Sequence, residues 1–173
     1  MRQTLCGVSL VLMAAIVAGG CTQSSQNAKN AAIDQNIVGA WRAKVQFDSG
    51  PFAAVKDLEF MYVFNAGGTM TESSNYDAAP PVPPAYGLWR SLGHNRYELR
   101  YEFYMTRVPD PSENLSIESG WLPAGRGVLV DTITLSSDGK SFVSRAHYTS
   151  YDLSGNQVPG GGVANTEGER MDF

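Results

Sequence analysis

The chain has 173 residues, of which 43% are hydrophobic and 17% charged, and its formal net charge is −4. This length and composition are typical of a single globular domain with a substantial core. Acidic and basic residues are interspersed, so the basic patch of a nucleic-acid-binding protein is absent, as is a polybasic run for an anionic membrane surface. The two cysteines, Cys6 and Cys21, precede the patterned part of the chain, which excludes an internal disulfide and a cysteine-based metal site there.

Residues 1–20 have the features of a secretory signal peptide. Arg2 lies near the start, and an apolar segment over residues 8–18, too short to span a bilayer comfortably, is followed by small residues. The exit Ala18-Gly19-Gly20-Cys21 resembles the lipoprotein box of bacterial lipoproteins, in which the cysteine is diacylated and becomes the mature N-terminus. That resemblance implies export and lipid anchoring to the cell envelope through Cys21. The alternative is a plain secreted protein with a chance cysteine at the cleavage site.

The residues after Cys21 predict a tether and then a folded domain. Thr22 at the next position favours, by the same resemblance, the outer membrane facing the periplasm if the source is Gram-negative. Residues 21–36 are polar and lack aromatic side chains, so they predict a flexible, lipid-anchored tether. The folded domain is therefore expected to cover residues 37–173.

Alternation of apolar and polar residues predicts β-strands throughout this domain. In the first, Trp41, Val45 and Phe47 fall on one face and the polar residues between them on the other. The predicted strands cover residues 41–47, 58–64, 69–73, 86–92, 96–106, 128–135, 142–151 and 163–173. Residues 77–84, 109–125 and 152–162 are rich in proline or glycine and predict long loops, and residues 137–140 predict a two-residue hairpin.

Eight strands joined mostly by hairpins predict an all-β fold. We expect an eight-stranded antiparallel up-and-down barrel, with little helix outside the signal peptide, because closure leaves no free strand edge. A sandwich of two sheets is the alternative.

The first strand also carries a family resemblance. Gly39-Ala40-Trp41 is similar to the Gly-x-Trp that opens the first strand of lipocalins, and residues 64–72 resemble bacterial lipocalin-like proteins. The chain thus resembles a lipocalin-like, calycin-type bacterial lipoprotein. In that family an arginine of the last strand packs across the tryptophan, which implies that Gly39, Trp41 and Arg170 form a structural seam where the barrel closes.

An inward-facing Trp41 sets the phase of the neighbouring strands and with it the candidate ligand-binding residues. These are aromatic and expected to face the lumen: Phe60, Tyr62, Phe64, Tyr97, Tyr101 and Phe103. Tyrosines suit a cavity for a small apolar or amphipathic molecule, because each offers an apolar body and one polar tip. The alternative is a packed core in which each hydroxyl finds a backbone partner.

Candidates for acid–base catalysis are Glu72, whose facing is ambiguous, and His147, which we expect to face outwards; the alternative is that His147 enters the lumen as an acid or base. Neither His94 nor His147 has another histidine or a cysteine at the spacing of metal ligands, and no cofactor-binding motif is present. We therefore expect no metal and no cofactor. The first functional hypothesis is therefore binding without chemistry. The alternatives are a cyclase or isomerase, as in some calycin-like barrels, and a structural lipoprotein whose loops at 77–84 and 109–125 contact an unknown protein partner.

Overall fold

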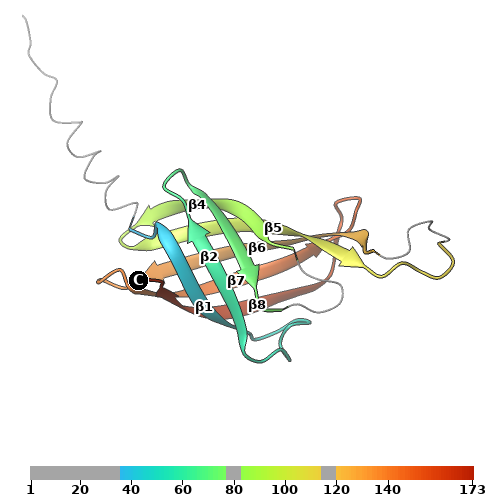
Figure 1. Cartoon of the computed structure of the whole chain (residues 1–173), viewed down its shortest axis with the longest axis horizontal. Coiled ribbons are helices and arrows are strands. Elements are labelled where there is room, and N and C mark those ends of the chain that lie inside the picture. The colour runs from blue at the N-terminus through green and yellow to red at the C-terminus, as the bar shows by residue number, and fades with distance from the viewer. Residues whose placement is uncertain (1–35, 77–82, 114–119) are drawn as a thin grey trace, which may run out of the picture.

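The computed structural model describes residues 36–76, 83–113 and 120–173, which form eight β-strands (Figure 1). The strands are β1 (Gly39–Phe47), β2 (Leu58–Phe64), β3 (Thr69–Ser74), β4 (Ala85–Gly93), β5 (Arg96–Arg107), β6 (Leu122–Leu135), β7 (Ser141–Tyr151) and β8 (Gln157–Arg170). Each strand pairs antiparallel with the next, and β1 pairs with β8, so the sheet closes.

The closed order confirms the predicted all-β, up-and-down barrel and excludes the two-sheet sandwich. The described residues contain no helix, and so none that is long and apolar enough to cross a bilayer. The signal peptide, Cys21 and nearly all of the tether lie outside the described residues, as does most of the predicted loop at 77–84.

Two strands begin six residues earlier than predicted, whereas the other starts agree to within two residues. β6 starts at Leu122 and β8 at Gln157, so residues 122–125 and 157–162 of the predicted loops belong to the sheet. The glycine residues in these segments led to the wrong prediction of loops. A Cβ atom on Gly125 would lie 2.0 Å from the carbonyl oxygen of Tyr151, so here glycine permits close strand pairing instead of a turn. The connection between β6 and β7 is also longer than the predicted two residues. The hydrogen bond nearest the turn runs from the Ser136 N–H to the Ser141 carbonyl (2.8 Å), so four residues lie between its two partners.

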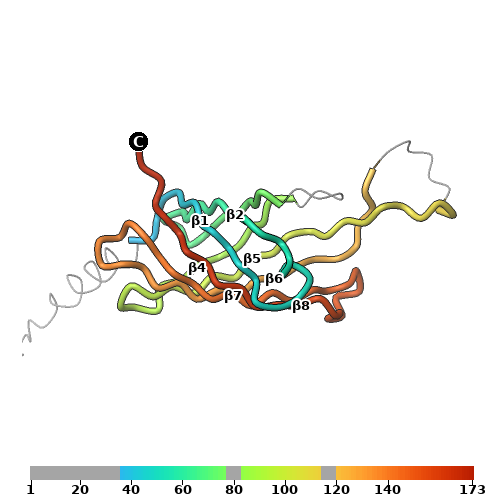
Figure 2. Tube along the Cα trace, turned by 90° about the horizontal axis from the view of Figure 1, so that it is seen from below, coloured from blue at the N-terminus to red at the C-terminus, as the bar shows by residue number. Residues whose placement is uncertain are grey.

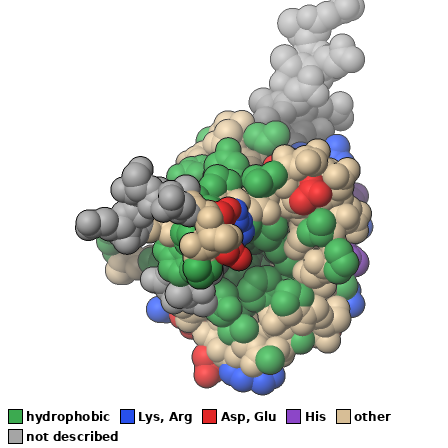
Figure 3. All heavy atoms as spheres, turned by 90° about the vertical axis from the view of Figure 1, so that its right-hand side faces the viewer, with side chains coloured by type: hydrophobic (Ala, Val, Ile, Leu, Met, Phe, Trp, Pro, Cys, Tyr) green, Lys and Arg blue, Asp and Glu red, His purple; other side chains and the backbone are tan. Residues whose placement is uncertain are grey.

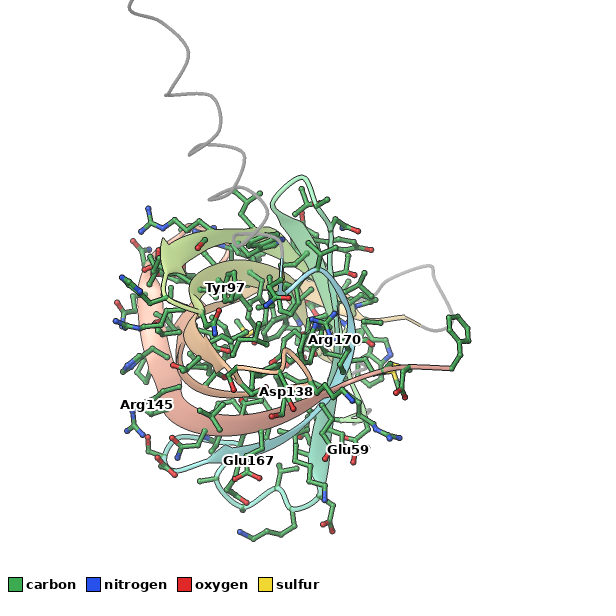
Figure 4. All side chains as sticks on the ribbon, turned by 90° about the vertical axis from the view of Figure 1, so that its left-hand side faces the viewer. Glu59, Tyr97, Asp138, Arg145, Glu167 and Arg170 are labelled. Atoms are coloured by element: carbon green, nitrogen blue, oxygen red, sulfur yellow. The ribbon has the colours of Figure 1, made fainter. Side chains whose placement is uncertain are left out.

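The barrel has two different ends. β1 begins and β8 ends at the first, which we call the seam end (Figure 4). At the other, the open end, β5 and β6 run on past the paired parts of β4 and β7 as a two-stranded ribbon, which projects to the right in Figures 1 and 2. The register shifts between Met105 and Thr106, and the pairing then continues to the tip of the ribbon, where Arg107 lies opposite Leu122.

The seam end is closed by Trp41 and Arg170, which lie opposite each other in the β1–β8 register. The guanidinium carbon of Arg170 lies 4.3 Å from the centre of the indole, which is fully buried. Arg170 also donates hydrogen bonds to the carbonyls of Val38 (2.7 Å) and Gly139 (2.8 Å). Gly39 has a φ of 135°, and a Cβ there would lie 2.8 Å from the Arg170 Nη1 atom. Glycine at position 39 thus leaves room for the guanidinium.

Candidate ligand-binding pocket

The six aromatic residues expected to line the lumen fall into two groups. Tyr62, Phe64, Tyr97 and Tyr101 are buried in a continuous core that fills the seam end and the middle of the barrel. Their rings pack against one another and against Trp89 and Phe142, with centroid distances of 5.8 to 6.5 Å. Only Phe60 and Phe103 line a hollow. The lumen is therefore filled over most of its length, and the available space lies at the open end.

A small hollow opens at that end between hydrophobic side chains (Figure 3). Its volume is about 40 Å³, and its lining is mostly aromatic: Phe47, Phe52, Leu58, Phe60, Glu72, Ser74, Tyr76, Phe103, Leu129 and Tyr148. A single water needs roughly 10–15 Å³ on this measure. The hollow thus has room for a few waters or for one small chemical group, and not for a whole large ligand.

The aromatic wall of the hollow comes from both strands and connections. Phe52, in the β1–β2 connection, lies with its ring centre 5.3 Å from Phe47, 5.4 Å from Tyr76 and 5.6 Å from Tyr148. Tyr148 in turn stacks on Phe103, with ring centres 6.0 Å apart and planes inclined by 14°. The connection after β1 therefore folds inwards and narrows the opening.

Sequence reasoning did not identify Phe52, Tyr76 and Tyr148 as pocket residues. A signal existed for Tyr148, because it shares the inner face of β7 with Phe142 and follows the outward-facing His147. No periodicity covers Phe52 or Tyr76, which lie in connections. Gly127 leaves room for two of the lining rings, since a Cβ there would lie 2.4 Å from the Phe103 ring and 2.8 Å from the Tyr148 ring.

Glu72 is the one carboxyl group among the residues that line the pocket. It lies on β3 opposite Tyr62, and its side chain is only 7% exposed. Its Oε1 atom has no hydrogen-bond partner among the described residues. Burial away from water disfavours the ionised form and raises the pKa of Glu72 to about 8. The structure thus places an unsatisfied carboxyl group in the wall of an aromatic hollow.

A second buried acid, Asp131, lies deeper in the barrel on β6. One carboxyl oxygen accepts a hydrogen bond from the Ser144 hydroxyl (2.9 Å), and Oδ1 has no partner among the described residues. Burial raises the pKa of Asp131 to about 6, opposed in part by the bond from Ser144. The Tyr62 and Tyr101 hydroxyls lie 3.5 Å apart, and burial, together with the charges of both acids, raises the pKa of each tyrosine.

The two candidate catalytic residues do not meet. Glu72 lies inside the barrel, whereas His147 lies on the outer face of β7 and is exposed, as its strand phase indicates. Among the residues that the structure describes, no group of three or more His, Cys, Asp or Glu side chains is placed to hold a metal ion. The hollow provides one buried carboxyl group, which can pair with a cation or exchange a proton.

A larger hollow, of about 480 Å³, lies on the outer face over β1, β7 and β8. Its charged lining residues carry both signs: Arg42, Lys44, Glu59, Glu167 and Glu169, of which Glu59 and Glu167 are labelled in Figure 4. Lys44 lies opposite Glu59 on one side and Glu167 on the other in the strand registers. Such cross-strand pairs of opposite charge are an ordinary feature of a solvated sheet face. The pocket at the open end is therefore the better candidate site.

No family model matches the chain, and no curated protein is significantly similar to it. The eight-stranded closed barrel is consistent with a calycin-like fold. The open-end pocket is therefore the feature of the chain that bears most directly on function.

Proposed function

We propose that the barrel binds a small apolar or amphipathic molecule at its open end. One observation carries the proposal: an aromatic hollow whose wall contains a buried carboxyl oxygen, Glu72 Oε1, that no described residue satisfies. A ligand group placed there would lie against Phe60 and Phe103, with Glu72 within its reach. The rest of such a ligand would lie towards the mouth, because the hollow holds only a small group.

The energetics of Glu72 support binding over a purely structural role. Burying a polar group without a hydrogen-bond partner costs roughly 1–3 kcal/mol in proteins, and apolar residues of similar shape avoid that penalty. A residue that served only to fill the barrel would therefore gain from being apolar. A ligand that satisfies the carboxyl group offsets the penalty in the bound state.

The cyclase or isomerase alternative has weaker support. It requires a second acid–base group facing the same ligand, and His147 lies on the opposite side of the barrel wall from Glu72. The buried hydroxyls of Tyr62 and Tyr101 are bonded to each other below the hollow. Binding of a ligand without catalysis requires neither a second acid–base group nor a free tyrosine hydroxyl.

We also propose that the barrel is attached to the cell envelope through a diacylated Cys21. Each buried methylene of an acyl chain contributes about 0.8 kcal/mol, so two chains suffice for stable anchoring. Labelled palmitate should enter the wild-type protein during expression in a bacterium and be lost in Cys21→Ser. An unlabelled wild type that is exported and cleaved would identify a plain secreted protein.

The binding proposal is tested by blocking the hollow. Ser74 lines it, and Ser73, the adjacent residue on β3, faces outwards. Calorimetric titration with hexylamine, hexanol and hexanoate samples three headgroups on one apolar chain. We expect at least one probe to bind the wild type and Ser73→Trp alike, and to bind Ser74→Trp at least tenfold more weakly. The proposal fails if no probe binds the wild type, or if Ser74→Trp binds as the wild type does.

A further inference from the structure

The carboxyl groups buried inside the barrel have no cationic partner among the described residues. The buried charged residues among those described are Glu72 and Asp131, and no lysine, arginine or histidine is buried with them. Arg170, the partly buried arginine at the seam end, is committed to backbone carbonyls of Val38 and Gly139. Within the described part of the chain, neither acid therefore has a neutralising cation inside the barrel, where the low dielectric makes a missing partner costly.

The aromatic wall of the hollow also favours a cation over an anion. Aromatic faces carry negative electrostatic potential and attract cations, most strongly where water is excluded. Phe47, Phe52, Phe103 and Tyr148 place four rings around the space that Glu72 borders. An anionic group would meet the ring faces unfavourably, and it would also be repelled by the ionised form of the carboxyl group.

We propose that the open-end pocket selects a primary ammonium group carried on an apolar body, with Glu72 as its counter-ion. This inference rests on the proposed binding function and names the class of ligand. The ammonium group is small enough for the hollow of about 40 Å³ and supplies N–H donors for Glu72 Oε1. The apolar body then lies against the aromatic rings towards the mouth.

Binding of a cation is coupled to the loss of a proton. Free Glu72, with a pKa of about 8, is mostly protonated at pH 7, and the ammonium group favours its ionised form. The carboxyl proton passes to solvent, and the ligand keeps all of its own protons. The other titratable groups around Glu72 are Tyr62 on β2, Tyr76 after β3, Tyr101 on β5, Asp131 on β6 and Tyr148 on β7. Asp131 changes charge at about pH 6, and burial raises the pKa of Tyr62, Tyr101 and Tyr148, which keeps these three hydroxyls protonated below pH 8.

The experiment compares the same three six-carbon probes on wild type, Glu72→Gln and Glu59→Gln. Glu59 faces outwards on β2, so its variant removes a carboxylate without touching the hollow. We expect hexylammonium to bind the wild type at least tenfold more tightly than hexanol, and hexanoate to bind most weakly. Glu72→Gln should remove the preference for the cation, and Glu59→Gln should keep it. Between pH 6 and 8 the wild-type affinity for hexylammonium should rise by up to about tenfold per unit, and that of Glu72→Gln should stay flat.

The outcomes separate this inference from the function on which it rests. Equal binding of hexanol and hexylammonium, unchanged in Glu72→Gln, overturns the ammonium site and leaves a neutral apolar pocket. Preferred binding of hexanoate also overturns it, because the carboxyl group would then act as a proton donor to an anion. Failure of all three probes on the wild type overturns the binding function itself.

Discussion

At the scale of single residues, Glu72 makes stability depend on pH. Its pKa is about 8 in the folded protein, against an ordinary value of 4.5. A carboxyl group with a raised pKa binds its proton more tightly in the folded state, so the stabilising contribution is complete below about pH 4.5 and is lost as pH rises through 8. Asp131, with a pKa of about 6, acts in the same direction over a lower range. The barrel should therefore be more stable in mild acid than in mild alkali.

Glu72→Gln should stabilise the protein at neutral pH. Replacing the ionisable group should raise the free energy of unfolding by about 3 kcal/mol at pH 7 and by much less at pH 5, because a tenfold change in a proton-binding constant corresponds to about 1.4 kcal/mol. Urea denaturation of wild type and variant at pH 5, 7 and 8 measures this difference. A variant that is less stable than the wild type at pH 7 would show that the buried carboxyl group has a partner.

The sequence leaves Glu72 ambiguous for a physical reason. β3 is short, covering Thr69–Ser74, and its polar residues do not show which face is buried. The register that pairs Glu72 with Tyr62 determines that Glu72 faces inwards. A register depends on both strands, so it cannot be read from the sequence of one strand. His147, by contrast, lies in a long strand whose alternation fixes its facing without any partner.

At the scale of strands, closure depends on the contact between β1 and β8. Trp41 is fully buried there, bonds through its indole N–H to the Ile37 carbonyl (2.8 Å) and lies under the Arg170 guanidinium. Trp41→Ala should lower the free energy of unfolding by about 3–5 kcal/mol, because it removes a large buried side chain and leaves a cavity. Chemical denaturation measures the loss.

A matched control is Trp121→Ala, which removes the same ring from an exposed position just before β6. Its effect should stay within roughly 0.5 kcal/mol, as for most surface changes. A loss of stability in Trp41→Ala as small as that in Trp121→Ala would mean that the β1–β8 contact does not depend on Trp41.

Strands were easier to predict than their ends. Alternation identified all eight, since each has one buried and one solvated face. The starts of β6 and β8 were missed because Gly125 and Gly160–Gly162 resemble loop residues, whereas the structure uses them where backbones approach closely. Close approach of two backbones leaves no periodic pattern in either strand.

At the scale of the whole molecule, the topology followed from the sequence and the state of the lumen did not. Hairpin connections determine the strand order, but the free space inside depends on how inward rings such as Tyr62, Tyr101 and Phe142 interlock across the barrel. The result is a barrel that is solid from the seam end to its middle and hollow only near the open end. A ligand would therefore enter by one end and reach only partway in.

The location of binding tests this account most directly. In an NMR titration of the isotope-labelled protein with hexylamine, we expect the amide shifts to change around the hollow, at Phe60, Glu72, Phe103 and Tyr148. Trp41 and the residues around it at the seam end should stay unperturbed. Shifts confined to the outer face around Lys44 and Glu167, or no shifts at all, would contradict binding at the open end.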